Sequence, residues 1–227
     1  MLAYHNDPKI KSRLITQLKL HAAADEIIKG VYWNEGKGCA VGCTIHSGNH
    51  ADYERLLGIP ETLAHLEDSI FEGLPNGKAK AWPMRFAKAV RPGADLLLVW
   101  PRFALWLLRD VLLQHASSDV RVLAAIDQTI KVYDTWIKTG SPDRAAARAA
   151  ERAAERAAET AERAAARAAA RATAEATAEA AAWAAERAAA ETAAETTRAR
   201  DKFWIAAADK LIELIKAAPM ARKGEGK

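Results

Sequence analysis

Large apolar residues recur three or four positions apart through most of the first 140 residues, which is the spacing of one face of an α-helix. From Pro8 to Lys29 this pattern includes Leu18 and Ile28, and Gly30 follows as a helix stop. The same spacing predicts further helices over 60–71, 80–90, 96–115 and 119–138. No stretch shows the sustained alternation of apolar and polar residues that a half-buried strand needs. The pattern therefore predicts an all-α fold.

The segment from Arg144 to Arg200 has a different composition, because 31 of its 57 residues are Ala and the rest are Arg, Glu, Thr and one Trp. Ala, Arg and Glu favour helix strongly. Its polar residues recur about 3.9 positions apart on average, whereas a straight α-helix has about 3.6 residues per turn. One straight helix would therefore have no face that is free of polar residues along its whole length. We expect a hairpin of two antiparallel helices, with its turn near Ala172–Thr177.

The limits of this segment are marked in the sequence. Gly140 ends one helix, Ser141 is a good N-cap, and Pro142 suits the first helical position. Large apolar residues return at Phe203 and need a core to bury against. We therefore predict a helical core domain formed by 1–142 and 201–218. The Ala-rich hairpin 143–200 is inserted into it, and 219–227 forms a disordered tail.

Composition and charge narrow the function classes. The net charge is only +4 and acidic and basic residues are interleaved, which argues against nucleic acid as a partner. Two Cys and the lack of a secretory signal at the start are typical of a cytoplasmic protein. The most apolar segment, Leu96–Leu108, is too short to cross a membrane and contains Pro101 and Arg102. We expect no membrane partner.

Most of the reactive side chains lie between Trp33 and His50. Residues 31–49 are rich in Gly and Cys, and we expect them to form a loop with a short turn. Cys39, Cys43, His46 and His50 are four, three and four residues apart, which on a helix would place all four on one face. Thiolate and imidazole are zinc ligands, so this set is a candidate metal site. Known zinc sites, however, usually separate the Cys pair from the His pair by a longer segment.

The same segment permits a cysteine-dependent hydrolase. Cys39 or Cys43 would be the nucleophile, and one of the nearby His residues would be its base. Glu35 would orient that base, and Gly backbone N–H groups would bind an oxyanion. The candidate bases are His5, His21, His46 and His50. The alternative is that two small Cys and several glycines simply pack this loop under the helices.

The Ala-rich segment suggests association with another helix. Arg144, Arg148 and Arg152 follow one another at four-residue spacing, and such like-charged ladders are unfavourable within one helix. They fit better against an opposite ladder on the same chain, on a second copy or on a partner protein. Trp183 lies among the polar positions and is a candidate contact residue, because interfaces favour Trp. The leading expectation is a non-enzymatic structural or interaction protein.

Three segments resemble one family of uncharacterised bacterial and phage-borne proteins. They are KGCAVGCTIH, YERLLGIPETLAHLEDSIFEGLPNGKAKAWPMRF and ADLLLVWP. The resemblance covers most of 30–110 and the ADKLIELIKAAP ending, with an Ala-rich region of variable length between them. It implies a grouping but no activity, ligand or partner.

Overall fold

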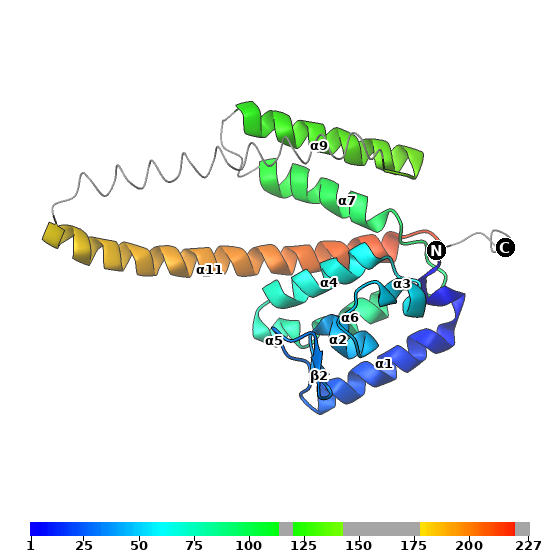
Figure 1. The fold of residues 1–227 in the computed structure, drawn as a ribbon. Helices are drawn as coiled ribbons and strands as arrows, with labels where there is room; N and C mark the ends of the chain where they lie inside the picture. Colours follow the sequence, from blue (N-terminus) through cyan, green and yellow to red (C-terminus); the bar gives the residue numbers. More distant parts are fainter. Residues whose placement is uncertain (114–119, 143–177, 221–227) are drawn as a thin grey trace. The chain divides into compact units, whose positions relative to one another are not determined.

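The computed structural model describes residues 1–113, 120–142 and 178–220 (Figure 1). These residues are mostly helical and include a single sheet of two short strands, which confirms the all-α class. Contacts divide the chain into two compact units, Met1–Trp100 with Ala199–Lys227, and Pro101–Arg198. The division differs from the expected core of 1–142, because the segment Leu107–Leu112 packs on the helix Val120–Thr139 of its own unit.

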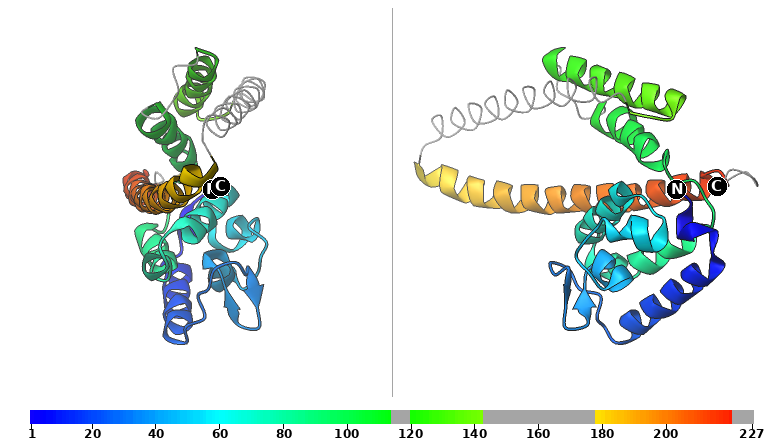
Figure 2. Two further views of the ribbon diagram at one scale, coloured as in Figure 1. Left: turned by 90° about the vertical axis from the view of Figure 1, so that its left-hand side faces the viewer. Right: turned by 45° about the vertical axis from the view of Figure 1, so that its right-hand side comes forward.

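The first unit is built from short helices and one hairpin of strands. Its elements up to residue 89 are η1 (Ala3–Asn6), α1 (Pro8–Ala23), β1 (Trp33–Asn34), β2 (Lys37–Gly38), α2 (Ala40–Ile45), α3 (Asp52–Leu57), α4 (Glu61–Gly73), α5 (Asn76–Ala79) and α6 (Trp82–Ala89). The two strands are antiparallel, with Trp33 opposite Gly38. The helix α2 packs against α1, α4 and α6, and Figure 2 shows these helices gathered around it.

The helix α1 begins where the sequence predicts and ends earlier. The Asp7 side chain accepts a hydrogen bond from the backbone N–H of Lys9, and Pro8 takes the first helical position. The helix stops at Ala23, because Asp25 adopts a left-handed conformation (φ 54°). Ile27 is still buried, but through a strand-like pairing with Gly38. Its apolar character therefore reflects a buried loop and not a longer helix.

The core of the first unit is closed by the end of the last helix, α11 (Ala178–Ala217). Leu211 and Ile215 are completely buried, which agrees with the expectation that this apolar segment needs a core. Beyond the helix, the Pro219 carbonyl accepts a hydrogen bond of 2.8 Å from the Asp95 N–H. Met220 pairs with Ala94 in an isolated bridge. The expected disordered tail therefore does not include 219 and 220, and 221–227 lie outside the described residues.

The second unit contains most of α7 (Val99–Trp106), the π-helix η2 (Leu107–Leu112), α9 (Val120–Thr139) and the first part of α11. An ion pair between Arg109 and Asp134 joins η2 to α9. Gly140 follows α9 with φ 76°, in agreement with the predicted stop. The predicted turn at Ala172–Thr177 and the first half of the predicted hairpin lie outside the described residues.

The helix α11 runs for 40 residues without a break, so the second half of the Ala-rich segment and the apolar ending are one helix. Trp183 lies in this helix, but the surroundings of its side chain are outside the description.

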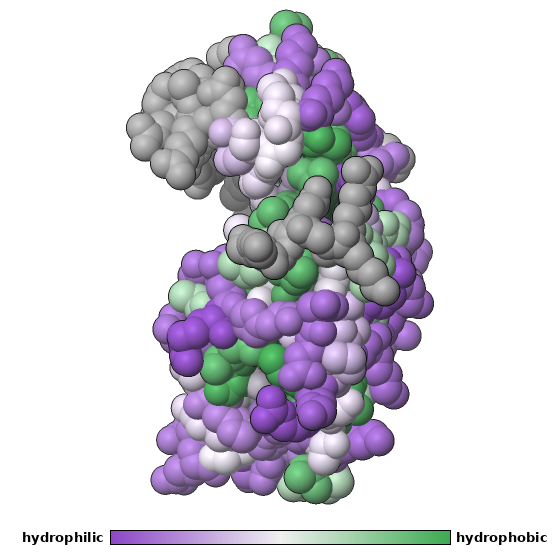
Figure 3. Space-filling model, turned by 90° about the vertical axis from the view of Figure 1, so that its right-hand side faces the viewer, coloured by the Kyte–Doolittle hydropathy of each residue, from purple (hydrophilic) through white to green (hydrophobic). Residues whose placement is uncertain are grey.

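Within the described ranges, none of the helices combines the length and apolar character needed to span a bilayer. Figure 3 shows a surface on which hydrophilic residues surround smaller hydrophobic patches.

Candidate acid–base site

Two glycines determine how the loop before α2 packs. A Cβ atom on Gly38 or Gly42 would lie 2.2 Å or 1.6 Å from the carbonyl oxygen of Tyr32. Only glycine therefore allows the backbone around Tyr32 to lie directly on the first turns of α2. This close approach accounts for the four-residue spacing of the glycines. It also fixes Trp33, the next residue along the chain.

The two cysteines of the same segment are core residues. Cys39 and Cys43 are both free and almost completely buried, and the Cys43 thiol donates to the Gly38 carbonyl at 3.3 Å. Burial raises the pKa of Cys43 to about 11. Burial, followed by the nearby Asp68 carboxylate, also raises the pKa of Cys39. A nucleophilic cysteine needs a lowered pKa and access to solvent, so this geometry gives neither thiol that role.

Glu35 lies apart from the other predicted site residues, whereas His50 and Cys39 both lie near the Asp68 carboxylate. The buried His50 ring stacks on His65 with centroids 4.1 Å apart, and its Nε2 lies 3.6 Å from a carboxylate oxygen of Asp68. Glu35 is exposed in the turn between the two strands. In the part of the chain that the structure describes, no group of three or more His, Cys, Asp and Glu side chains is arranged to hold a metal ion. The four predicted zinc ligands are thus not brought together.

The structure instead connects His46 to His21 and Glu26. His46 follows the last residue of α2 in a left-handed conformation (φ 53°), and its Nε2 lies 2.8 Å from Nε2 of His21 on α1. The other ring nitrogen of His21, Nδ1, lies 2.6 Å from Oε2 of Glu26. His21 is buried, Glu26 is half-buried and His46 is exposed. The three side chains form a hydrogen-bonded chain from a carboxylate to an accessible imidazole.

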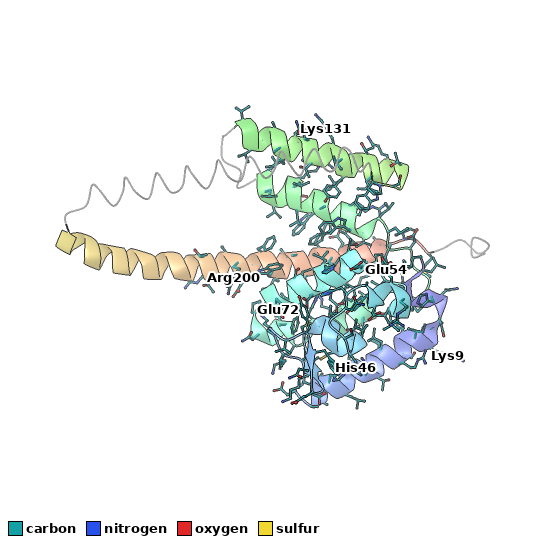
Figure 4. The ribbon with its side chains drawn as sticks, in the orientation of Figure 1. Lys9, His46, Glu54, Glu72, Lys131 and Arg200 are labelled. Carbon is teal, nitrogen blue, oxygen red and sulfur yellow. The ribbon has the colours of Figure 1, made fainter. Side chains whose placement is uncertain are left out.

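Neighbouring side chains fix the position of the His46 ring. The Trp33 ring stacks on it with centroids 4.5 Å apart and an angle of 18° between the planes. The Gln17 side chain on α1 donates hydrogen bonds to the carbonyls of Cys43 and Thr44, at 2.7 and 3.0 Å. These bonds hold the end of α2 against α1. His46 is labelled in Figure 4, where it lies beside α1.

When both imidazoles are neutral, the hydrogen bonds determine which ring nitrogens of His21 and His46 carry protons. An ionised carboxylate only accepts hydrogen bonds, so Nδ1 of His21 is the donor to Glu26. Nε2 of a neutral His21 is then an acceptor, and Nε2–H of His46 donates to it. This leaves Nδ1 of His46 as an unprotonated acceptor. Partial burial and then His21 lower the pKa of His46, and the Glu26 charge opposes this shift. His46 is therefore neutral near pH 7.

The three hydrogen-bonded side chains line a groove of about 750 Å³ along α1. Its lining combines hydroxyl, amide, cationic and apolar side chains with the three members of the chain. The residues are Ser12, Arg13, Thr16, Gln17, Leu20, His21, Ala24, Glu26 and His46. An accessible base at the wall of a groove is an arrangement that can accept a proton from a bound molecule.

Part of this site is predictable from the sequence. His21 and His46 are both among the predicted bases, but the predicted orienting acid, Glu35, is not near them. Glu26 takes that position, because the chain reverses after α1 and returns Glu26 to the His21 ring. The five-residue separation of His21 and Glu26 is not a helical contact spacing, so the sequence carries no local signal for this pair.

Comparison with known proteins adds no family to these observations. No family model, no curated protein sequence and no solved structure matches the chain.

Proposed function

We propose that this protein uses His46 as a general base on a molecule bound in the groove along α1. The observation that carries the proposal is the hydrogen-bonded chain Glu26–His21–His46, which ends on an exposed imidazole lining that groove. In this role Nδ1 of His46 accepts a proton from water or from a hydroxyl group of the bound molecule. The reaction class is proton transfer that activates an oxygen nucleophile.

His21 and Glu26 stabilise the protonated form of His46. When His46 becomes an imidazolium, its Nε2–H makes a charge-assisted hydrogen bond to His21, which is stronger than the neutral one. His21 in turn keeps its Nδ1–H directed at the Glu26 carboxylate, whose negative charge offsets the new positive charge. His21 and Glu26 are therefore positioning residues, and His46 is the catalytic residue. The arrangement extends by one imidazole the carboxylate–imidazole pairing that orients bases in hydrolases.

An NMR pH titration tests the protonation scheme without knowledge of the substrate. The His46 resonance should titrate with a pKa below that of a free histidine, since burial and His21 lower it. Glu26→Gln should lower the pKa of His46 further, because the Glu26 charge favours the imidazolium. His65→Gln is the matched control, since this exposed histidine stacks on His50 outside the groove. An unchanged His46 titration in Glu26→Gln would refute the relay.

A generic ester tests the reactivity. In the presence of a chelator, the full chain should hydrolyse p-nitrophenyl acetate, and His46→Gln should reduce the rate constant by about 10²-fold, the lower end of the usual contribution of a positioned base. His65→Gln should retain the wild-type rate. Equal rates for the two variants would show that hydrolysis comes from ordinary surface imidazoles, and would overturn the proposal.

Self-association through 143–200 is a second proposal, supported by the unbroken course of α11 from Ala178 to Ala217. A continuous helix presents its Ala-rich turns at fixed angles, as a helix–helix contact requires. The full chain should be oligomeric by light scattering, and Trp183→Ala should shift it toward monomer at the same concentration. Thr192→Ala on the same helix is the control. A monomeric wild-type chain would refute this proposal.

A further inference from the structure

The two imidazoles of the acid–base site present ring nitrogens to each other in an open groove. Nε2 of His21 and Nε2 of His46 are 2.8 Å apart and come from different elements, α1 and the residue after α2. The other nitrogen of His21 is hydrogen-bonded to Glu26. A carboxylate that binds the far nitrogen of a histidine is the usual outer partner of a metal-binding imidazole, because it fixes the ring and increases its basicity.

We propose that His21 and His46 bind one divalent transition-metal ion through their Nε2 atoms, with Glu26 as the outer partner of His21. Imidazole nitrogens favour zinc, copper and nickel over calcium or magnesium. The site supplies two protein ligands, so water or a group of a molecule in the groove completes the coordination. This proposal does not rest on the proposed base, since it concerns binding and not turnover.

The metal fits with little movement. Zinc–imidazole bonds are about 2.0–2.1 Å long, so two nitrogens at a tetrahedral zinc lie about 3.3 Å apart. The two Nε2 atoms therefore have to separate by only a fraction of an ångström from 2.8 Å. A tilt of the His46 ring is enough for this separation, because His46 is the more exposed of the two residues, while Trp33 and Gln17 keep its backbone and ring in place. The shift is small beside the 4.5 Å between the His46 and Trp33 ring centroids, so metal binding does not require this stack to break.

Metal binding moves one proton within His46. A neutral imidazole coordinates through the nitrogen that has no proton, so the hydrogen on Nε2 of His46 must move to Nδ1. His21 already has its proton on Nδ1, directed at Glu26, and needs no change. No net proton is released by the neutral pair. The metal-bound form then has no unprotonated nitrogen on His46, so the metal blocks the base that the metal-free form offers.

Calorimetric titration of the full, chelator-treated chain with zinc chloride and nickel chloride tests the site. We expect one ion per chain, and His46→Gln should weaken binding at least tenfold. Glu26→Gln should weaken it 10- to 100-fold, the usual effect of removing an outer partner. His65→Gln should bind as the wild type does. Binding that is the same in His46→Gln, or no binding at millimolar metal, would overturn the proposal.

A ¹⁵N NMR spectrum gives an independent readout of the proton position. In the metal-free chain His46 should show the Nε2–H tautomer, and with zinc it should show the Nδ1–H tautomer. His65 should not change. If the tautomer stays the same at saturating zinc, the ion binds elsewhere and the proposal fails. Such a failure leaves the ester assay in chelator unaffected, so the two proposals are judged separately.

Discussion

Substitution of Gly42 by Ala tests the packing on which the acid–base site depends. The new Cβ would lie 1.6 Å from the Tyr32 carbonyl oxygen, whereas real Cβ contacts are essentially never closer than 3.0 Å. The neighbour is a backbone atom, so no rotamer change relieves the clash. Either the chain around Tyr32 or the helix α2 must move.

The size of the effect follows from what this movement disrupts. Overpacking of a tight core usually costs about 1–3 kcal/mol. Moving the backbone around Tyr32 also disrupts the hydrogen bond that the Cys39 N–H shares between the Val31 and Tyr32 carbonyls, at 2.7 and 3.3 Å, which is worth about 1 kcal/mol. It shifts Trp33 away from His46, a contact worth about 0.5–1.5 kcal/mol. We therefore expect Gly42→Ala to lower the free energy of unfolding by about 2.5–5.5 kcal/mol, a large part of the stability of a small domain.

Urea denaturation followed by tryptophan fluorescence measures this change, and Gly77→Ala is the matched control. Gly77 lies in α5, and a Cβ there would meet nothing within 4 Å. Since Ala favours helix over Gly by about 1 kcal/mol, the control should be as stable as the wild type or slightly more stable. If Gly42→Ala unfolds at the wild-type urea concentration, the close approach of Tyr32 to α2 is incorrect.

Three other outcomes are expected. The pKa of the fully buried Glu67 is raised to about 8 by burial; the folded chain therefore binds an extra proton, and stability should fall as pH rises from 4.5 to 8, by at most about 1.4 kcal/mol per pH unit. Urea unfolding at several pH values should show a weaker fall in Glu67→Gln, and an equal fall would refute this assignment. Cys39 and Cys43 should resist a thiol reagent at pH 8 in the folded chain and react only in denaturant, since their pKa values are raised; rapid labelling of the native chain would contradict their burial. Gly73→Ala should destabilise the chain by about 1–3 kcal/mol, because its Cβ would lie 2.1 Å from the Trp204 ring; a wild-type urea midpoint would show that the ring can move aside at little cost.

The local patterns in the sequence predicted helices better than they predicted helix ends. Pro8 and Gly140 mark their boundaries correctly, because proline and glycine act through the conformation of their own backbone. The end of α1 is different. Ile27 continues the helical spacing, yet it is buried by pairing with Gly38, a contact across the chain that periodicity does not contain.

The candidate site shows the same limit. The pattern of Cys39, Cys43 and His46 suggested shared chemistry, but a six-residue helix with its first turns buried directs the cysteines into the core and leaves only His46 exposed. The residues that form the site with His46 are His21 on α1 and Glu26 in the loop after it. The contact between His46 and His21 depends on the tertiary packing of α2 on α1, so no residue spacing in the sequence predicts it.

The continuity of α11 has a consequence for how the Ala-rich segment can change in length. Each residue inserted into or removed from a helix rotates everything on its far side by about 100°. A single insertion between Ala184 and Arg198 would therefore turn the earlier residues out of phase with Leu211 and Ile215, which are fixed in the core. Steps of about 7 or 11 residues nearly restore the phase. Length variants of α11 that keep its earlier turns in phase with Leu211 and Ile215 therefore differ by about two or three helical turns, whereas a flexible linker has no such phase to keep.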